Sequence, residues 1–396
     1  MKIKSCLLCN FFAIFLLSPS FAFNFDSEYK NEKLYLHEIV NYSLNPHWDN
    51  EWEKNYFKQN GIKLSFGSIA SDKLLCIGDI VINQELDKNL TFRYFFKWRA
   101  SKYRNTEEKN SYFGLEKALY NNISVFFMLN PAYNKDELDG LLGISIMDYS
   151  FEQYIRVSLC YDDFIYDKKN SMGGKTEKAP IGVKWDIRIG SDTLWLFSEG
   201  KYSSGFKRKY PIIELSPIVT SHEQQINDVI LKLYLKINSN SLSEINYYHY
   251  HFYEVKKHYK NLDNYSYLNE INNISLKYML SLTYDDRIRT EINYLFQNSK
   301  AFGCRDYKYH RHDFMPAIFY EHDFENTSFE IGYMSSTFNW DNNELNNAYT
   351  NSGYIDKIKM GWTYFFGNKA KLQLSVSHVL SVSGFGGGNL QYILIF

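Results

Sequence analysis

The sequence predicts an all-β protein, a closed antiparallel transmembrane β-barrel of about eighteen strands, with about sixteen as the second choice. Three observations lead to this prediction. Apolar and polar residues alternate in run after run between residues 61 and 396, and a period of two is that of a β-strand. Many runs span about 9–12 residues, the length that a tilted strand needs to cross a bilayer. Aromatic residues make up 18% of the chain, with 34 Tyr and 30 Phe, and both types favour strands and membrane–water interfaces.

The composition argues against membrane-spanning helices without arguing against a membrane protein. The chain has 396 residues, a formal net charge of −1 and 45% hydrophobic residues, and its mean hydropathy is −0.41. No run comes near the roughly 18–20 apolar residues that a membrane helix needs. A transmembrane barrel carries its apolar side chains at alternate positions, so its mean hydropathy stays low.

The N-terminus is typical of a secretory leader. Lys2 and Lys4 form a charged start, Cys6–Leu17 is apolar, and Ser20–Ala22 is a small-x-small cleavage site. Residues 1–22 are therefore predicted to be a signal peptide that is cleaved near Ala22. Residues 23–60 lack the alternating pattern and are expected to form a periplasmic arm or a plug in the barrel mouth, the alternative being a disordered arm. Residues 61–396 are predicted to form the barrel.

The strand pattern is clearest in two neighbouring runs. Ile274–Leu282 and Ile288–Phe296 carry mainly apolar or aromatic residues at even positions, with residues such as Arg289 and Glu291 between them. Such alternation predicts one face toward lipid and one toward an enclosed interior. Similar alternation occurs in Ile62–Gly67, Leu90–Arg99, Ile181–Ile189, Val229–Ile237, Phe329–Tyr333, Ile358–Phe366 and Leu372–Val376.

Connections between the runs alternate between short and long, as expected for turns at one rim and loops at the other. About nineteen runs can be distinguished, whereas single-chain bacterial barrels have an even number. One run between Gly205 and Asn272 is therefore misassigned, and the candidates are Pro211–Thr220 and Tyr247–Tyr259. The short connections are Glu85–Asn89, Tyr120–Asn122, Gly190–Thr193, Tyr284–Arg287, Asp323–Thr327 and Gly367–Lys369, and the long ones are Asn130–Gly140, Asp167–Ala179, Ser299–Asp306 and Trp340–Gly353.

The last run has an apolar or aromatic residue at every second position: Leu390, Tyr392, Leu394 and Phe396. Together with the leader, this ending resembles the C-terminal strand of Gram-negative outer-membrane β-barrels of the porin-like kind, although no single family matches. The resemblance implies insertion in the outer membrane of a Gram-negative bacterium, contact with its lipid and assembly by the barrel-assembly machinery. The alternative is the last strand of a soluble sheet.

Basic residues dominate the polar positions of the predicted strands. If the apolar positions face lipid, these side chains line the bore and raise the local concentration of anions. The alternative is that they pair with acids across the bore or extend along the wall. The predicted pore-lining residues are Arg93, Lys97, Arg99, Arg156, Lys184, Arg188, Lys232, Lys277, Arg289, Glu291, Lys357 and Lys359.

No catalytic or metal site is predicted, and no cofactor is expected. The pairs His249/His251 and His310/His312 have the spacing of metal ligands on one strand face, but rim or loop histidines are the favoured interpretation. Barrel phospholipases have a Ser and a His two positions apart on one strand. Ser375–His378 is the only nearby candidate, and no third member of a triad can be identified. The mature cysteines Cys76, Cys160 and Cys304 are widely spaced and do not indicate a disulfide framework.

The sequence thus favours an outer-membrane channel or export porin for polar, perhaps anionic solutes or an acidic polysaccharide. One alternative is a barrel enzyme that acts on lipid or lipopolysaccharide. Another is an adhesin or receptor that acts through loops such as Asn339–Gly353. A secreted chain of near-neutral charge is not expected to bind nucleic acid.

Overall fold

A computed structural model describes residues 60–68, 74–101, 106–131, 139–148, 153–161, 175–178, 181–209, 219–258, 264–303, 307–344, 347–367, 370–380 and 384–396. The chain divides into two units, residues 1–36 and 37–396, and every described residue belongs to the second. The predicted signal peptide and nearly all of the predicted arm lie outside the described residues. Within the described part, no helix is long and apolar enough to cross a membrane.

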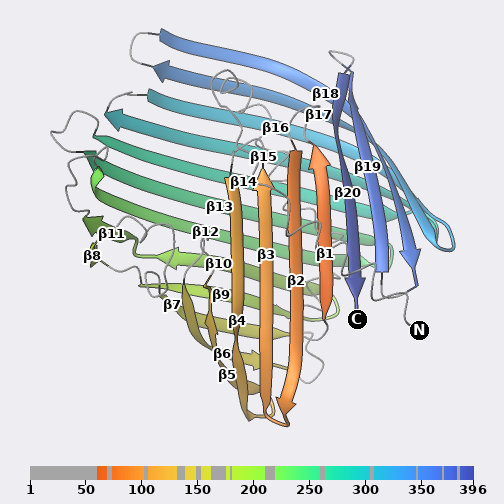
Figure 1. Ribbon diagram of the computed structural model, residues 1–396. Coiled ribbons are helices and arrows are strands. Elements are labelled where there is room, and N and C mark those ends of the chain that lie inside the picture. Colours follow the sequence, from red (N-terminus) through yellow and green to blue (C-terminus); the bar gives the residue numbers. More distant parts are fainter. Residues whose placement is uncertain are drawn as a thin grey trace, which may run out of the picture. The chain divides into compact units, whose positions relative to one another are not determined.

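The described residues form strands joined by turns (Figure 1). Alternation of β-branched, aromatic and polar residues suits a pleated surface with two different faces. The strands are β1 (Gly61–Ser68), β2 (Leu74–Asp87), β3 (Leu90–Ser101), β4 (Thr106–Tyr120), β5 (Ile123–Leu129), β6 (Gly140–Met147), β7 (Tyr154–Tyr161), β8 (Lys175–Lys178), β9 (Ile181–Gly190), β10 (Leu194–Ser203), β11 (Phe206–Lys209), β12 (Val219–Asn238), β13 (Ser241–His258), β14 (Tyr265–Ser281), β15 (Asp286–Gly303), β16 (Tyr307–Asp323), β17 (Thr327–Glu344), β18 (Asn347–Phe366), β19 (Ala370–Val379) and β20 (Gly384–Ile395).

The sheet closes on itself. Every neighbouring pair is antiparallel, and β1 pairs along its whole length with both β2 and β20 (Figure 1). The backbone N–H of Phe396 donates to the carbonyl of Asn60 at 2.9 Å beyond the last ladder pair. β8 and β11 are short and pair with each other beside β12, whereas β9 pairs with β7 and β10. The ring therefore has 18 strands, which confirms the predicted closed barrel and its strand number.

The structure accounts for the odd strand in the sequence count. Tyr247–His258 belongs to β13, a continuous strand that starts at Ser241. Val219 and Thr220 begin β12, and most of the other candidate, Pro211–Pro217 included, lies outside the described residues. The short connections lie at the rim that holds Phe396, because Phe366 pairs with Ala370, and Ala370 pairs with Leu394.

Two predicted long loops are wrong. β15 continues to Gly303 and β16 starts at Tyr307, so most of Ser299–Asp306 is strand. β17 continues to Glu344 and β18 starts at Asn347, so the described residues of Trp340–Gly353 are strand. Polar residues are frequent in both stretches, because the strands continue past the continuous apolar part of their outward face.

The two faces of the sheet differ as the alternation predicts. In β7, Ile155, Val157 and Leu159 are exposed, whereas Arg156 and Ser158 between them are buried. The same pattern of outward apolar side chains recurs around the ring. Exposed apolar side chains on the convex side of a closed barrel form a lipid-facing surface.

Two parts of the ring differ in strand length. β5, β6 and β7 have 7, 8 and 8 residues, close to the roughly 9–11 residues of a membrane-spanning strand. β13–β18 have between 17 and 20 residues. We call β3–β7 with β9 the N-terminal wall, and β13–β18 the C-terminal wall.

Candidate functional site: the inner wall of the barrel

The predicted lining residues whose side chains are described lie on the inward face, opposite the exposed apolar positions. Arg93, Arg156 and Arg188 come from the N-terminal wall, and Arg289 and Lys357 from the C-terminal wall; all five are buried against their surroundings. The other described members are Lys184, Lys232, Lys277, Glu291 and Lys359. Lys97 and Arg99 belong to β3, but their side chains lie outside the described part of the chain.

One carboxylate is at the centre of the N-terminal wall. Arg93 Nε donates to Glu116 Oε2 at 2.5 Å, and Arg156 Nη1 lies 3.2 Å from the same oxygen. Ser124 Oγ donates to the other oxygen of Glu116, and Arg93 Nη1 donates to Asn83 at 2.7 Å. A buried carboxylate between two guanidinium groups is well compensated.

One cation is at the centre of the C-terminal wall. Arg289 Nε lies 2.9 Å from Glu291, its Nη1 lies 2.9 Å from Glu321, and its Nη2 lies 2.6 Å from Glu330. Lys359 Nζ also reaches Glu330, at 3.2 Å. Arg287 pairs with Glu321 at 3.4 Å and with Asp323 at 2.7 Å. The network therefore extends to the rim of short turns. Alternating charges across β15–β18 hold these side chains in fixed places.

Several inward aromatic rings lie over a glycine of a neighbouring strand, and each has an arginine guanidinium group near its face. Phe319 pairs with Arg289 on one side and with Gly332 on the other. The guanidinium lies 4.5 Å from the ring centroid, and a Cβ at Gly332 would come within 2.0 Å of Phe319 Cδ1. The glycine therefore leaves the space that the ring fills, and the ring faces the cation.

The ring-over-glycine arrangement occurs on both walls. Phe126 lies over Gly143 and under Arg156, at 4.3 Å. The other examples are Trp195 over Gly190 with Arg188 at 4.8 Å, and Phe338 over Gly353 with Arg311 at 5.8 Å. The alternation of apolar and polar residues does not predict this arrangement. Its signal is an inward aromatic residue opposite an inward glycine, which is visible only once the strand register is known.

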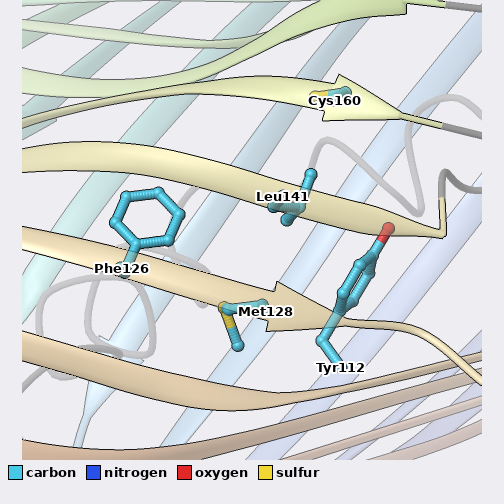
Figure 2. Close-up of a cluster of buried hydrophobic side chains, with 5 residues drawn as sticks. All are labelled: Tyr112, Phe126, Met128, Leu141 and Cys160. Carbon is cyan, nitrogen blue, oxygen red and sulfur yellow. The ribbon is translucent and has the colours of Figure 1, made fainter.

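The N-terminal wall also has an apolar cluster on its inward face (Figure 2). Tyr112, Phe126, Met128, Leu141 and Cys160 come from four neighbouring strands and are 1–8% exposed. Lys184 lies 5.7 Å from the ring centroid of Tyr112. The cysteine in this cluster, Cys160, is a free thiol, as is Cys76. This part of the inner wall is packed with apolar side chains, so the alternation of apolar and polar faces does not hold there.

The walls differ in charge as well. On the C-terminal wall, the described inward bases are matched by as many acids, whereas on the N-terminal wall they outnumber the acids. The C-terminal set is Lys256, Lys277, Arg287, Arg289, Arg311, Lys357 and Lys359 with Glu244, Glu254, Glu291, Asp313, Glu321, Asp323 and Glu330. The N-terminal set is Arg93, Arg156, Lys184 and Arg188 with Glu116 and Asp186.

The histidine pairs face outward, away from the bore. His249 Nδ1 lies 2.9 Å from Asn272, and His251 Nδ1 lies 3.4 Å from Glu270. His312 Nδ1 lies 2.7 Å from the hydroxyl of Tyr294. In the part of the chain that the structure covers, no group of three or more His, Cys, Asp or Glu side chains could hold a metal ion.

The serine and histidine considered for hydrolysis lie on opposite faces of β19. Ser375 is buried on the inward face, whereas His378 is exposed on the outward face. Ser377 Oγ donates to the carbonyl of Gly387 at 3.2 Å. Because the two side chains of a catalytic pair must meet, Ser375 and His378 do not form one.

No family model matches the sequence, and no curated protein matches it either. Among solved structures, the chain is similar to a bacterial polysaccharide outer membrane secretin, with a TM-score of 0.41 and 8% identity over 85% of this chain and 98% of that one. It is also similar to OmpT, an outer membrane protein of Vibrio cholerae, with a TM-score of 0.40 and 8% identity over 85% and 96% of the two chains. An outer membrane channel from Pseudomonas putida F1 gives a TM-score of 0.35 and 10% identity over 85% and 96%. These likenesses are too distant to bear on function, which has to be inferred from the chain's own geometry.

Proposed function

We propose that this protein is an outer-membrane channel for polar solutes, with a preference for anions that comes from the N-terminal wall. The observation that carries the proposal is the contrast between the two faces of the closed barrel. Apolar side chains are exposed on the outside, whereas charged side chains gather on the inside. This distribution suits a barrel with lipid outside and an aqueous interior.

The size of the ring supports permeation. Barrels of about 16–18 strands are wide enough to leave an aqueous channel, whereas the side chains of about eight strands fill the interior. The packed apolar cluster at Tyr112 and Phe126 occupies one sector of this ring. Polar solutes are therefore expected to pass along the charged C-terminal wall and the arginines next to the cluster.

The proposed anion preference depends on few side chains. Among the described side chains, bases and acids balance on the C-terminal wall, so its field on a passing ion largely cancels. The excess of bases on the N-terminal wall does not cancel, and Lys184 is one of its more accessible members. Anion preference is therefore expected to be moderate and sensitive to this wall.

Reconstitution in planar bilayers tests both parts of the proposal. The full chain should give stepwise conductance, and the reversal potential in a potassium chloride gradient should favour chloride. Lys184→Glu together with Arg188→Glu should shift that potential toward potassium. The single variant Lys184→Glu, which leaves the stacked Arg188 in place, should give a shift of the same sign and smaller size.

Two outcomes would contradict the proposal in different ways. Absence of conductance from correctly folded protein would refute the channel itself. Conductance with unchanged reversal potentials in both variants would refute the anion preference and leave the channel. Lys117→Glu is the matched control, because Lys117 is exposed on the outward face of β4, and the measured shift should be smaller.

A further inference from the structure

On the outer surface of the C-terminal wall, the continuous run of apolar side chains lies near the rim of short turns, and single apolar side chains such as Phe302 are exposed beyond it. On β15 the outward side chains from Ile288 to Phe296 are mainly apolar or aromatic, and Asn298 and Lys300 follow. About nine residues at about 3.3 Å each span about 30 Å along a strand. At a tilt of about 45° this covers roughly 21 Å of thickness, close to the apolar band of about 25 Å on such barrels.

The apolar surface ends in register on neighbouring strands. His249 pairs with Asn272, Asn272 with Phe296, and Phe296 with His312. One step further from the turns, His251 pairs with Glu270, Glu270 with Asn298, and Asn298 with His310. The two rows run across β13, β14, β15 and β16 along the hydrogen-bond ladder.

Outward polar side chains in these rows bind one another. Asn272 accepts a hydrogen bond from Tyr247 at 3.0 Å and lies 2.9 Å from His249, and Glu270 lies 3.5 Å from Asn298 Nδ2. Such groups are costly in hydrocarbon, where no water can bind them. On β15 and β16 the edge of the hydrocarbon is therefore expected near the first row, with the second row at about the level of lipid headgroups.

Two lysines follow directly beyond these rows. Lys300 of β15 and Lys308 of β16 are paired residues on the outward face, and Lys308 is exposed. Directly opposed like charges on one face of a sheet are unfavourable. Within the described residues, no carboxylate lies at ion-pair distance from either ammonium group. His310 is the next outward residue along β16, and it pairs in the ladder with the exposed Asp341 of β17. Three basic side chains and one acid therefore share this outward surface.

We propose that Lys300, Lys308 and His310 bind the phosphate of an anionic lipid whose acyl chains lie along the apolar surface below. An anion between the opposed lysines removes their repulsion and forms charge-assisted hydrogen bonds. Phe296 and Phe314, which face outward closer to the turns, supply the surface for the acyl chains. The site is on the outside of the barrel, so it is independent of permeation through the bore.

Native mass spectrometry of the full-length, detergent-solubilised protein tests the proposal with phosphatidic acid and phosphatidylcholine of the same acyl chains. The wild type should retain phosphatidic acid at concentrations where phosphatidylcholine is lost. Lys300→Glu with Lys308→Glu should weaken phosphatidic acid binding roughly tenfold or more, because two charge-assisted contacts become repulsive. Lys300→Gln with Lys308→Gln should weaken phosphatidic acid binding less. This second variant still tests the proposal if the charge-reversed protein misfolds.

The matched control reverses two lysines at the opposite rim. Lys88 is in the β2–β3 turn and Lys117 faces outward on β4, and both are exposed. Lys88→Glu with Lys117→Glu should leave phosphatidic acid binding unchanged. Equal retention of the two lipids by the wild type, or equal losses in the test and control variants, would overturn the proposal. Displacement of phosphatidic acid by millimolar inorganic phosphate would instead assign the site to free phosphate and overturn the lipid assignment.

Discussion

Each wall of the barrel contains a buried ion cluster, and the central groups of the two clusters have opposite charges. On the N-terminal wall a single carboxylate, Glu116, binds two arginines, whereas on the C-terminal wall a single arginine, Arg289, binds three carboxylates. Both central groups are buried on the inward face. The first arrangement leaves positive charge in excess and the second leaves negative charge, which the neighbours Arg287 and Lys359 offset.

The charge on the inward face therefore differs from one wall of this barrel to the other. The N-terminal wall combines a buried ion cluster on β3, β4 and β7 with a packed apolar cluster on β4–β7. Long strands such as β15 and β16 carry an extended network that reaches Asp323 at the rim of short turns. The proposed selectivity therefore depends on the first wall, and we propose that the second wall mainly stabilises its long strands.

Loss of Arg289 should have the largest effect on stability. Arg289→Ala leaves Glu291, Glu321 and Glu330 close together without their shared partner, and breaking a buried ion pair costs about 3–5 kcal/mol. Urea titration of refolded protein, followed by tryptophan fluorescence, measures the loss. Arg289→Lys keeps the charge and should lose less. A change below about 1 kcal/mol for Arg289→Ala would show that the network is not a stabilising one.

Loss of Glu116 should cost a similar amount but respond differently to acid. Glu116→Ala leaves Arg93 and Arg156 facing each other, and guanidinium groups do not lose their protons. The carboxylates stranded by Arg289→Ala can instead take up protons as the pH falls. Lowering the pH from about 7 to about 4.5 should therefore reduce the stability difference between Arg289→Ala and the wild type. The stability difference between Glu116→Ala and the wild type should not become smaller. Equal recovery in both variants would remove the proposed contrast between the walls.

The ring-over-glycine arrangement should have an intermediate effect. Gly332→Ala places a methyl group within 2.0 Å of the Phe319 ring, so the ring and Arg289 have to move, at a cost of about 1–3 kcal/mol. Gly361→Ala is the matched control, because its nearest neighbour, Glu330 Cβ, is 3.4 Å away. The same denaturant titration compares them. Equal stability of the two variants would show that the glycine is not needed to seat the ring.

Loss of Lys359 should have the smallest effect. Lys359→Met removes one of two cations from Glu330, which keeps its bond with Arg289. A partly exposed ion pair contributes about 0.2–1 kcal/mol, and the change in unfolding free energy should stay in that range. A loss as large as that of Arg289→Ala would place Lys359, rather than Arg289, at the centre of the network.

Alternation alone was enough to predict the fold. The even positions of Ile288–Phe296 face outward, and the final strand pairs with the first described strand. The strand ends were harder to predict, because the polar sequences at Ser299 and Trp340 suit either a loop or a strand outside the lipid. The contacts of the inner wall could not be predicted, because the partners of Arg289 lie on three strands whose register depends on every turn between them.

The seam between β1 and β20 sets the order in which the barrel can be completed. Ser65 Oγ donates to Asn389 Oδ1 at 2.8 Å across a separation of 324 residues, and all eight residues of β1 pair with the last strand. Hairpins between consecutive strands can form early, but this contact has to wait until the whole circumference is in place. Until then both strand edges remain open to pairing with other chains, so ring closure is the step at which misassembly competes most strongly with folding.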